Sequence, residues 1–281
     1  SYHGLGYASL AVTSLRSGYR APFESQLNSH VDFCHYPHSE EELPDTLAEL
    51  ERLLKLGLYG AVILEPILGR GGCSVPPPGA LQRIAELTRK HGALLIADEI
   101  WTGLGRTGSW LRCDAVGVTP DLVTLGKGLG GGLPISACLG RAEVMAAWQQ
   151  PQETVHTSTF TGTPLACRTA AVTLDVLSEE GLVQRSAALG ARWLEALRAK
   201  LSGNSRVHAV RGAGMMIGID FGPWKGGASV VQRELVRRGI ITSTGGGARE
   251  VLVLTPALNV PEDALLSFVA EIAASLQALA Q

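Results

Sequence analysis

Residues 93–132 read ALLIADEIWTGLGRTGSWLRCDAVGVTPDLVTLGKGLGGG, and this stretch decides the fold. Two apolar runs inside it, 93–99 and 121–126, have the length and composition of buried strands. The first ends in an acidic pair that begins with Asp98, and the second is followed by Lys127 and a glycine-rich turn. Because parallel strands end at one edge of a sheet, the aspartate and the lysine can meet in one pocket.

The surrounding sequence continues this alternation of strand and helix. Apolar runs at 60–66 and 135–140 read as two more strands, and helical patterns fill 45–57 and 79–92. Such alternation predicts an α/β domain with a largely parallel sheet. Glu65 ends the run at 60–66, so it joins the aspartate and the lysine at the edge where ligands gather in such sheets.

The two ends of the chain differ from this central part. A long helical tract, interrupted near Gly181, is followed by short strand and helix patterns that predict a smaller α+β domain. We therefore expect a large domain over 1–165, and a connecting helix with the small domain over 166–281. Residues 1–40 are rich in Gly, Ser, His and Tyr, and they predict loop with at most one short helix near 5–14.

Composition excludes several classes of protein. A net charge of −2 gives no electrostatic basis for binding nucleic acid or an anionic membrane, and no apolar run reaches membrane-spanning length. The five cysteines are odd in number, scattered and without a C-x-x-C pair, which predicts neither a disulfide framework nor a zinc site. Reduced thiols in a cytoplasmic protein are the expectation.

Lys127 lies between an apolar strand and a glycine-rich turn, and not on a surface helix. A desolvated lysine loses proton affinity and becomes an amine nucleophile that forms Schiff bases with carbonyl compounds, pyridoxal phosphate included. The competing interpretation, a phosphate-binding P-loop, requires Gly at 121 and Ser or Thr at 128. Asp121 and Gly128 stand there instead, so the P-loop is rejected.

Asp98 is the natural partner of this lysine. A carboxylate at a buried strand end needs a cation or hydrogen-bond donors. In a pyridoxal enzyme it would pair with the pyridinium nitrogen and keep the ring an electron acceptor. The alternative is an aspartate that caps the turn after the strand.

The glycines of the stretch raise a different possibility. Gly103, Gly105 and Gly108 spell the G-x-G-x-x-G dinucleotide fingerprint. The fingerprint must open a long helix and be followed by a strand that ends in an acidic residue. Residues 109–121 do not read as a helix, and Asp121 begins a strand, so a nicotinamide or flavin site is not expected.

These residues together resemble one family. The chain is similar to the class III (omega-type) aminotransferases, pyridoxal-phosphate enzymes of fold type I, over nearly its whole length. The resemblance rests on segments in matching order: YHG (2–4), YRAPF (19–23), ILEPI (63–67), IADEIWTGLGRTG (96–108), PDLVTLGKGLGGGLPISACLG (120–140), HTSTFTGTPLACRTA (156–170) and VRGAGMMIGID (210–220). It implies an α/β fold of fold type I, with a mostly parallel-sheet large domain and a smaller α+β C-terminal domain.

The resemblance also implies roles for individual residues. Lys127 would hold pyridoxal 5'-phosphate covalently and shuttle a proton, and Asp98 would pair with the pyridine nitrogen. Tyr2 would stack on the cofactor ring, with His3 and Gly4 beside it. Without the resemblance, Tyr2 would be read as a frayed terminal residue.

Three further residues are placed near the cofactor by the same resemblance. Thr159 would reach the phosphate of the neighbouring subunit's cofactor, which implies a homodimer with shared active sites. Glu65 matches a glutamate close to the active site, although an ordinary strand-end carboxylate is the alternative. Trp101, which stands where relatives often have Gln or Val, would crowd the cofactor or line the substrate pocket.

The chain departs from the family in two other respects. The segment that usually cradles the cofactor phosphate, together with the first strand and helix, would lie upstream of residue 2, so we expect an N-terminally incomplete chain. Several relatives bind the substrate carboxylate with an arginine where this chain has Val253, and carry a glutamate where it has Arg70. We therefore predict that Arg70 binds the substrate carboxylate; the alternative is a solvated loop residue.

The expected function is transfer of an amino group from an amine or amino acid to a 2-oxo acid, with no nucleic acid or membrane partner. Two alternatives stay open. One is an aminomutase or decarboxylase that uses the same cofactor and fold. The other is a non-catalytic remnant that serves as a binding or structural protein.

Overall fold

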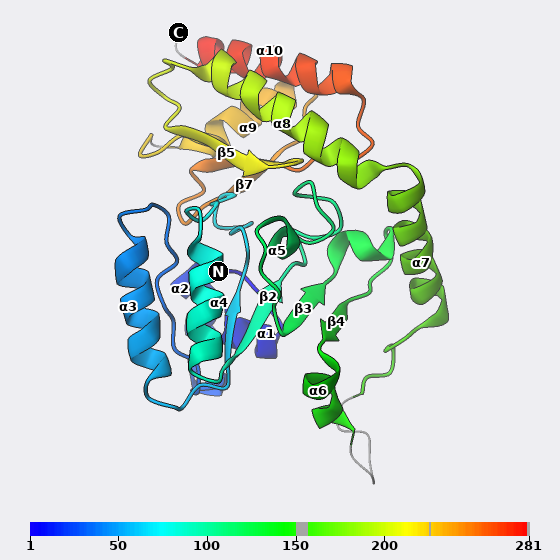
Figure 1. Cartoon of the computed structure of the whole chain (residues 1–281). Helices are drawn as coiled ribbons and strands as arrows, with labels where there is room; N and C mark the ends of the chain where they lie inside the picture. Colours follow the sequence, from blue (N-terminus) through cyan, green and yellow to red (C-terminus); the bar gives the residue numbers. More distant parts are fainter. Residues whose placement is uncertain (150–156, 225, 280–281) are drawn as a thin grey trace.

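The structure is a computed structural model, and it describes residues 1–149, 157–224 and 226–279 (Figure 1). The chain forms two separate four-stranded sheets, one in its first half and one in its second. Among the described helices, none is long and apolar enough to cross a membrane. The five cysteines are all free.

The first sheet has the strand order β1-β2-β3-β4. Its strands are β1 (Ala61–Leu64), β2 (Leu94–Asp98), β3 (Leu122–Leu125) and β4 (Ala137–Gly140). The first three run parallel, whereas β4 pairs antiparallel with β3. The prediction of an α/β fold with a largely parallel sheet is confirmed.

Two amphipathic helices cover one face of this sheet. They are α3 (Leu43–Leu54) and α4 (Ala80–Lys90), which lie side by side in Figure 1. Leucines at helical spacing in α3, such as Leu47 and Leu50, are buried with Leu64 of β1 and Leu95 of β2. Burial of one apolar stripe of each helix therefore holds the helices on the sheet.

The second sheet is antiparallel throughout, with the order β5-β6-β8-β7. Its strands are β5 (Ala209–Ala213), β6 (Met216–Asp220), β7 (Ser243–Gly245) and β8 (Val251–Leu254). The helices that share its core are α8 (Leu182–Leu201), α9 (Gly227–Arg237) and α10 (Glu262–Ala278). The backbone of α8 comes so close to the β5–β6 turn that a Cβ on Gly190 would lie 2.2 Å from the Gly214 carbonyl oxygen.

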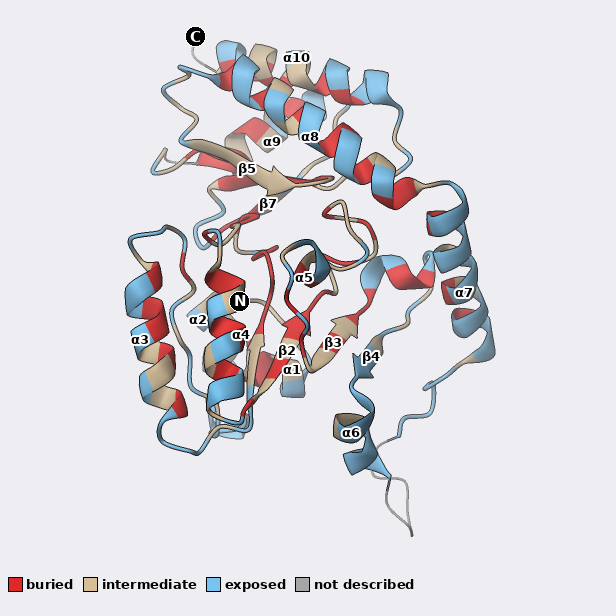
Figure 2. Cartoon of the chain, viewed as in Figure 1, coloured by how far each residue is buried: buried red, intermediate tan, exposed pale blue. Residues whose placement is uncertain are grey.

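The helix α7 (Pro164–Glu179) joins the two halves and packs Ala170 against Val123 and Leu129. The predicted break near Gly181 is confirmed, because Gly181 takes a left-handed conformation (φ 60°) between α7 and α8. Much of the surface of α7 is exposed (Figure 2). The division of the chain at residue 165 stays a prediction.

The N-terminal segment is more helical than its composition indicated. Besides the expected short helix, α1 (Tyr7–Ala11), it contains α2 (Ser17–Arg20) and a 3-10 helix over Ala21–Gln26. The prediction of at most one helix there was wrong. Aromatic contacts, such as Tyr7 against Phe23 at 5.6 Å between ring centroids, accompany these turns.

Candidate active site

The candidate site lies at the edge where the parallel strands of the first sheet end. Asp98 is the last residue of β2 and pairs in register with Thr124 of β3. Lys127 begins the 3-10 turn Lys127–Gly130 directly after β3. The sheet therefore brings the aspartate and the lysine to one edge, as the sequence predicted.

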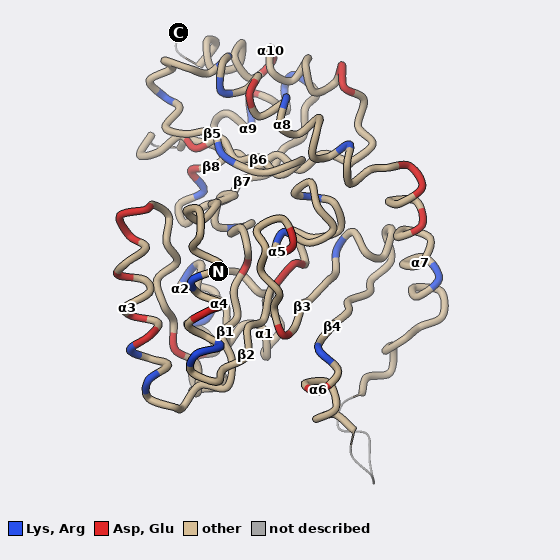
Figure 3. Tube along the Cα trace, viewed as in Figure 1, with Lys and Arg blue, Asp and Glu red and all other residues tan. Residues whose placement is uncertain are grey.

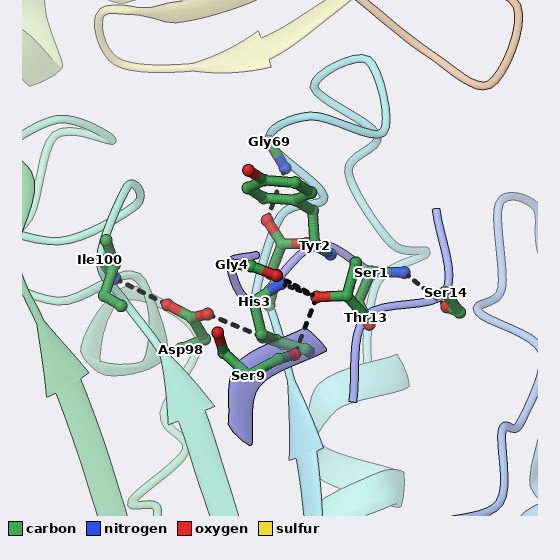
Figure 4. A network of polar contacts seen from close by, with 11 residues as sticks. Ser1, Tyr2, His3, Gly4, Ser9, Thr13, Ser14, Gly69, Asp98 and Ile100 are labelled. Carbon is green, nitrogen blue, oxygen red and sulfur yellow. Dashed lines mark hydrogen bonds and ion pairs between the residues drawn. The ribbon is translucent and has the colours of Figure 1, made fainter. Parts of the chain in front are cut away.

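Both carboxylate oxygens of Asp98 already have donors. The residue is only 6% exposed. Its Oδ1 accepts the Ile100 backbone N–H at 3.0 Å, which is the turn cap expected as the alternative role. Its Oδ2 lies 2.7 Å from Nδ1 of His3 (Figure 4). A carboxylate accepts through several lone pairs, so Asp98 keeps capacity for a further donor.

His3 is held in place by the residues around it. Its backbone N–H donates to Thr13 Oγ1 at 2.9 Å, and the Thr13 hydroxyl in turn lies 3.0 Å from the carbonyl oxygen of Gly4 (Figure 4). Gly4 has φ 119°, and a Cβ there would come within 2.7 Å of Ser9 Oγ. No motif in the sequence indicated that Thr13 supports His3.

The His3 ring is almost fully enclosed, with its side chain 3% exposed. Hydrogen bonding to the Asp98 carboxylate requires a proton on Nδ1. Nε2 is buried and has no hydrogen-bond partner within the described ranges. The ring therefore serves to orient the carboxylate, because its one formed hydrogen bond is to Asp98.

Lys127 is strained and partly shielded. It is a non-glycine residue with φ 45°, a conformation that side chains rarely adopt and that often occurs at functional sites. Its Nζ lies 5.3 Å from the ring centroid of Trp101. Burial lowers the pKa of Lys127, Asp98 and Glu65 oppose that shift, and the positive charge of Arg70 adds to it. A lowered pKa leaves more of the amine free to act as a nucleophile.

Glu65 connects two segments of the site. Its carboxylate is 5% exposed. Oε1 accepts the Tyr2 backbone N–H at 2.8 Å, and Oε2 accepts the Gly69 backbone N–H at 3.0 Å. Burial raises the pKa of Glu65, while these two hydrogen bonds oppose the shift. Glu65 therefore positions backbone rather than presenting a free carboxylate.

The aromatic residue Tyr2 sits between two neighbours. Its ring meets the ring of Tyr19 edge to face at 6.0 Å, and the guanidinium carbon of Arg70 lies 5.3 Å from its centroid. The structure thus brings Tyr2, Arg70 and Glu65 together. Tyr2 is not a frayed end here, because its backbone is anchored to Glu65.

A pocket of about 700 Å³ opens beside Lys127. Its lining includes Trp101, Thr173 of α7, and the segment 257–259 from the second half of the chain. Trp101 is packed so closely that a Cβ on Gly69 would lie 2.4 Å from its ring. The tryptophan therefore forms part of the pocket wall next to the lysine.

Arg106 lines the same pocket, although the sequence showed it only as one residue of a glycine-rich turn. Its Nη1 donates to the carbonyl oxygens of Met215 (3.1 Å) and Pro256 (2.6 Å), and burial lowers its pKa to about 10. Its fixed donors tie the turn to the second sheet.

The helix that follows the glycines is short. It is α5 (Arg112–Ala115), with four residues, whereas the dinucleotide fingerprint needs a long helix, so the rejection of that fingerprint agrees with the structure.

Thr159 is the predicted site residue that the structure leaves apart. It lies exposed in the loop before α7, and among the described residues it forms no hydrogen bond with Asp98 or Lys127. A role toward a neighbouring subunit stays a prediction.

The residues present fit pyridoxal phosphate on their chemistry. A buried carboxylate with spare acceptor capacity, an amine of lowered pKa and an aromatic face are what the ring nitrogen, the aldehyde carbon and the ring plane require. Asp98, Lys127 and Tyr2 supply them around one sheet edge.

Comparison with known proteins points to the same chemistry. The family model for class III aminotransferases matches residues 1–276. Acetylornithine aminotransferase of Methanothermobacter thermautotrophicus is 34% identical over 264 residues, 94% of this chain and 63% of the relative. Ornithine aminotransferase 1 of Staphylococcus aureus is 37% identical over 273 residues, 96% of this chain and 64% of the relative.

Solved structures agree. A structure of ornithine aminotransferase from Toxoplasma gondii, with PLP at partial occupancy in its active site, superposes with a TM-score of 0.88 at 34% identity, covering 99% of this chain and 62% of that one. An aminotransferase of Bacillus anthracis gives a TM-score of 0.89 at 26% identity, covering 99% of this chain and 67% of that one. The chain thus spans less than two thirds of the length of the curated relatives named above.

Proposed function

The chain belongs to the class III aminotransferase family, and we propose on that basis that it transfers an amino group from an amine or amino acid to a 2-oxo acid with pyridoxal phosphate as cofactor. The observation that carries the proposal is the meeting of Asp98 and Lys127 at one sheet edge. The donor becomes a carbonyl compound and the oxo acid becomes an amino acid, so the exchange involves no net oxidation.

Each residue has a distinct task in this scheme. The cofactor supplies an electrophilic carbon and a ring that accepts electrons. Lys127 would hold that carbon through Nζ and, when its amine is free, would move a proton as general base and acid. Asp98 would accept a hydrogen bond from the ring nitrogen, and His3 keeps the Asp98 carboxylate oriented.

Three other residues shape the cofactor pocket. Tyr2 would lie against the ring plane, and Gly4, at φ 119°, allows the tight turn that carries His3. Glu65 anchors the Tyr2 backbone. Trp101 closes the wall beside Lys127 and limits substrate size there.

We also propose a homodimer in the cytoplasm. Thr159, in its exposed loop, would complete the phosphate site of the second copy. Large apolar side chains are exposed on and near α7, which supports burial against a partner: Phe160 (82%), Leu165 (65%) and Val172 (41%). We further propose an amino donor similar to ornithine, because the relatives are named acetylornithine aminotransferase and ornithine aminotransferase.

The test is spectroscopic. Purified protein incubated with pyridoxal phosphate should acquire the absorption of bound cofactor, and an amino donor should change that absorption while releasing an oxo compound. A spectral change with loss of carbon dioxide, or with an isomerised amine, would identify a decarboxylase or an aminomutase. Protein that stays colourless with added cofactor would contradict the proposal and favour a non-catalytic remnant.

A further inference from the structure

The guanidinium of Arg70 differs from three others around the site. Arg16 and Arg106 donate to backbone carbonyl oxygens at 2.6–3.1 Å, and Arg211 pairs with Asp220 at 2.7 Å. Arg70 has no carboxylate or carbonyl partner for its side chain in the described part of the chain. It is thus a guanidinium at this site with its donors unused.

The loop that carries Arg70 is nevertheless fixed on both sides. The Gly69 N–H donates to Glu65, and the Arg70 carbonyl oxygen accepts the Gly246 N–H at 2.8 Å. The side chain lies exposed over the Tyr2 ring, which guides it without satisfying its hydrogen bonds. The backbone that carries Arg70 is thus held in place while its guanidinium donors stay free to bind an anion.

The charge of Arg70 also reaches the reacting amine. It contributes to the lowered pKa of Lys127, so the two cations lie within electrostatic range across the site opening. An anionic group bound between them would relieve this repulsion. Among substrates of the proposed reaction, the group of that charge is the carboxylate.

We propose that Arg70 binds a substrate carboxylate, and that the site therefore prefers amino acids and 2-oxo acids to amines that lack a carboxylate. A planar guanidinium suits this task because its N–H groups match two carboxylate oxygens. The inference rests on the proposed aminotransferase function and names the substrate class for it.

A matched pair of donors tests the proposal. Alanine and isopropylamine differ only in a carboxylate in place of a methyl group. In Arg70→Gln, kcat/KM for alanine should fall about 10- to 100-fold, as expected for the loss of a charged hydrogen bond, while the value for isopropylamine stays within about twofold. Arg70→Lys should recover part of the loss, and Arg52→Gln, on the remote helix α3, should change neither donor.

Binding without turnover gives a second measurement. Glutarate has two carboxylates but no amino or keto group. Calorimetry should show that it binds the cofactor-loaded protein, and that it binds Arg70→Gln at least about tenfold more weakly. An unchanged alanine-to-isopropylamine ratio together with unchanged glutarate affinity would overturn the proposal. If wild-type protein turns over no amine at all, the aminotransferase function fails, and the glutarate measurement alone decides the role of Arg70.

Discussion

At the carboxyl edge of the first sheet, buried or partly buried ionisable groups follow strands that are otherwise apolar. The second sheet has a different environment. Its strand β6 (Met216–Asp220) is buried along its whole length, and the core between this sheet and its helices is almost entirely apolar. Figure 3 shows several charged positions along the outer helix α3.

The difference separates chemistry from stability. Asp98 and Glu65 are desolvated, and their burial is offset by hydrogen bonds from Ile100, His3, Tyr2 and Gly69. The strands of the second sheet bury mainly apolar area. Where β6 ends in the buried Asp220, that carboxylate is also compensated, by Arg211 at 2.7 Å and by the Gly222 N–H at 2.7 Å. Changes at the site edge should therefore alter activity, and changes in the second core should alter stability.

Replacement of the lysine is the strongest test of this separation. Lys127→Ala should lower turnover by at least about 10⁴-fold, because in the proposed reaction the amine acts both as nucleophile and as proton shuttle. Its melting temperature should stay close to the wild-type value, because alanine keeps a Cβ at the same φ of 45° and the Lys127 side chain forms no hydrogen bond within the described residues. Steady-state kinetics and thermal melting measure the two effects, and retained turnover would break the assignment.

The aspartate should have the next largest effect. Asp98→Asn keeps the shape but removes the negative charge, so kcat should fall about 10²- to 10³-fold, the size seen when one electrostatic contact is lost. Cofactor affinity, measured by absorbance titration, should also weaken. A variant with normal kcat would show that Asp98 serves the hydrogen bonds with Ile100 and His3 and not the cofactor.

The core of the second sheet gives the reverse outcome. Ile217 is fully buried, and Ile217→Ala should destabilise the protein by about 2–5 kcal/mol in denaturant unfolding. The matched change Leu266→Ala, at a residue 56% exposed on α10, should stay within about 0.5 kcal/mol. At temperatures where Ile217→Ala is folded, its turnover should be close to wild type.

A smaller effect is expected at the wall of the pocket. Gly69→Ala would place a methyl group 2.4 Å from the Trp101 ring, so the ring must move, at a cost of about 1–3 kcal/mol. Tryptophan fluorescence and KM should both shift. Gly60→Ala, where a Cβ would meet nothing within 4 Å, should leave both unchanged.

The smallest effect concerns pH. Because the pKa of Lys127 is lowered, more of its amine is unprotonated at a given pH than in a lysine of ordinary pKa. In cofactor-free protein, acetylation at about pH 9 should therefore label Lys127 faster than its exposure alone predicts. Arg70→Gln should raise the pKa of Lys127 and slow its labelling, and an unchanged rate would contradict that coupling.

The sequence allowed the first sheet to be predicted well, because its strands are continuous apolar runs that end in charged residues. Glu65, Asp98 and Lys127 were grouped from that pattern alone. Tyr2 and His3 required the family resemblance, since no period marks residues at the start of the chain.

Other features could not be read from the sequence. The His3 N–H donates to the Thr13 hydroxyl within an irregular segment, where no sequence repeat indicates which side chain faces inward. The turn cap expected as the alternative role of Asp98 is present at Oδ1, whereas the contact of Oδ2 with His3 was not indicated by the sequence. The additional turns over Ser17–Gln26 were missed because they are short and stabilised by contacts with distant segments, such as Arg16 with Gly246.

The most direct test of the central claim is to locate the cofactor on the chain. Protein incubated with pyridoxal phosphate is reduced with borohydride, digested and mapped by mass spectrometry. The account predicts a pyridoxyl adduct on Lys127, absent from Lys127→Ala and weakened in Asp98→Asn. Protein without an adduct, or with adducts spread equally over Lys55 and Lys90, would contradict it.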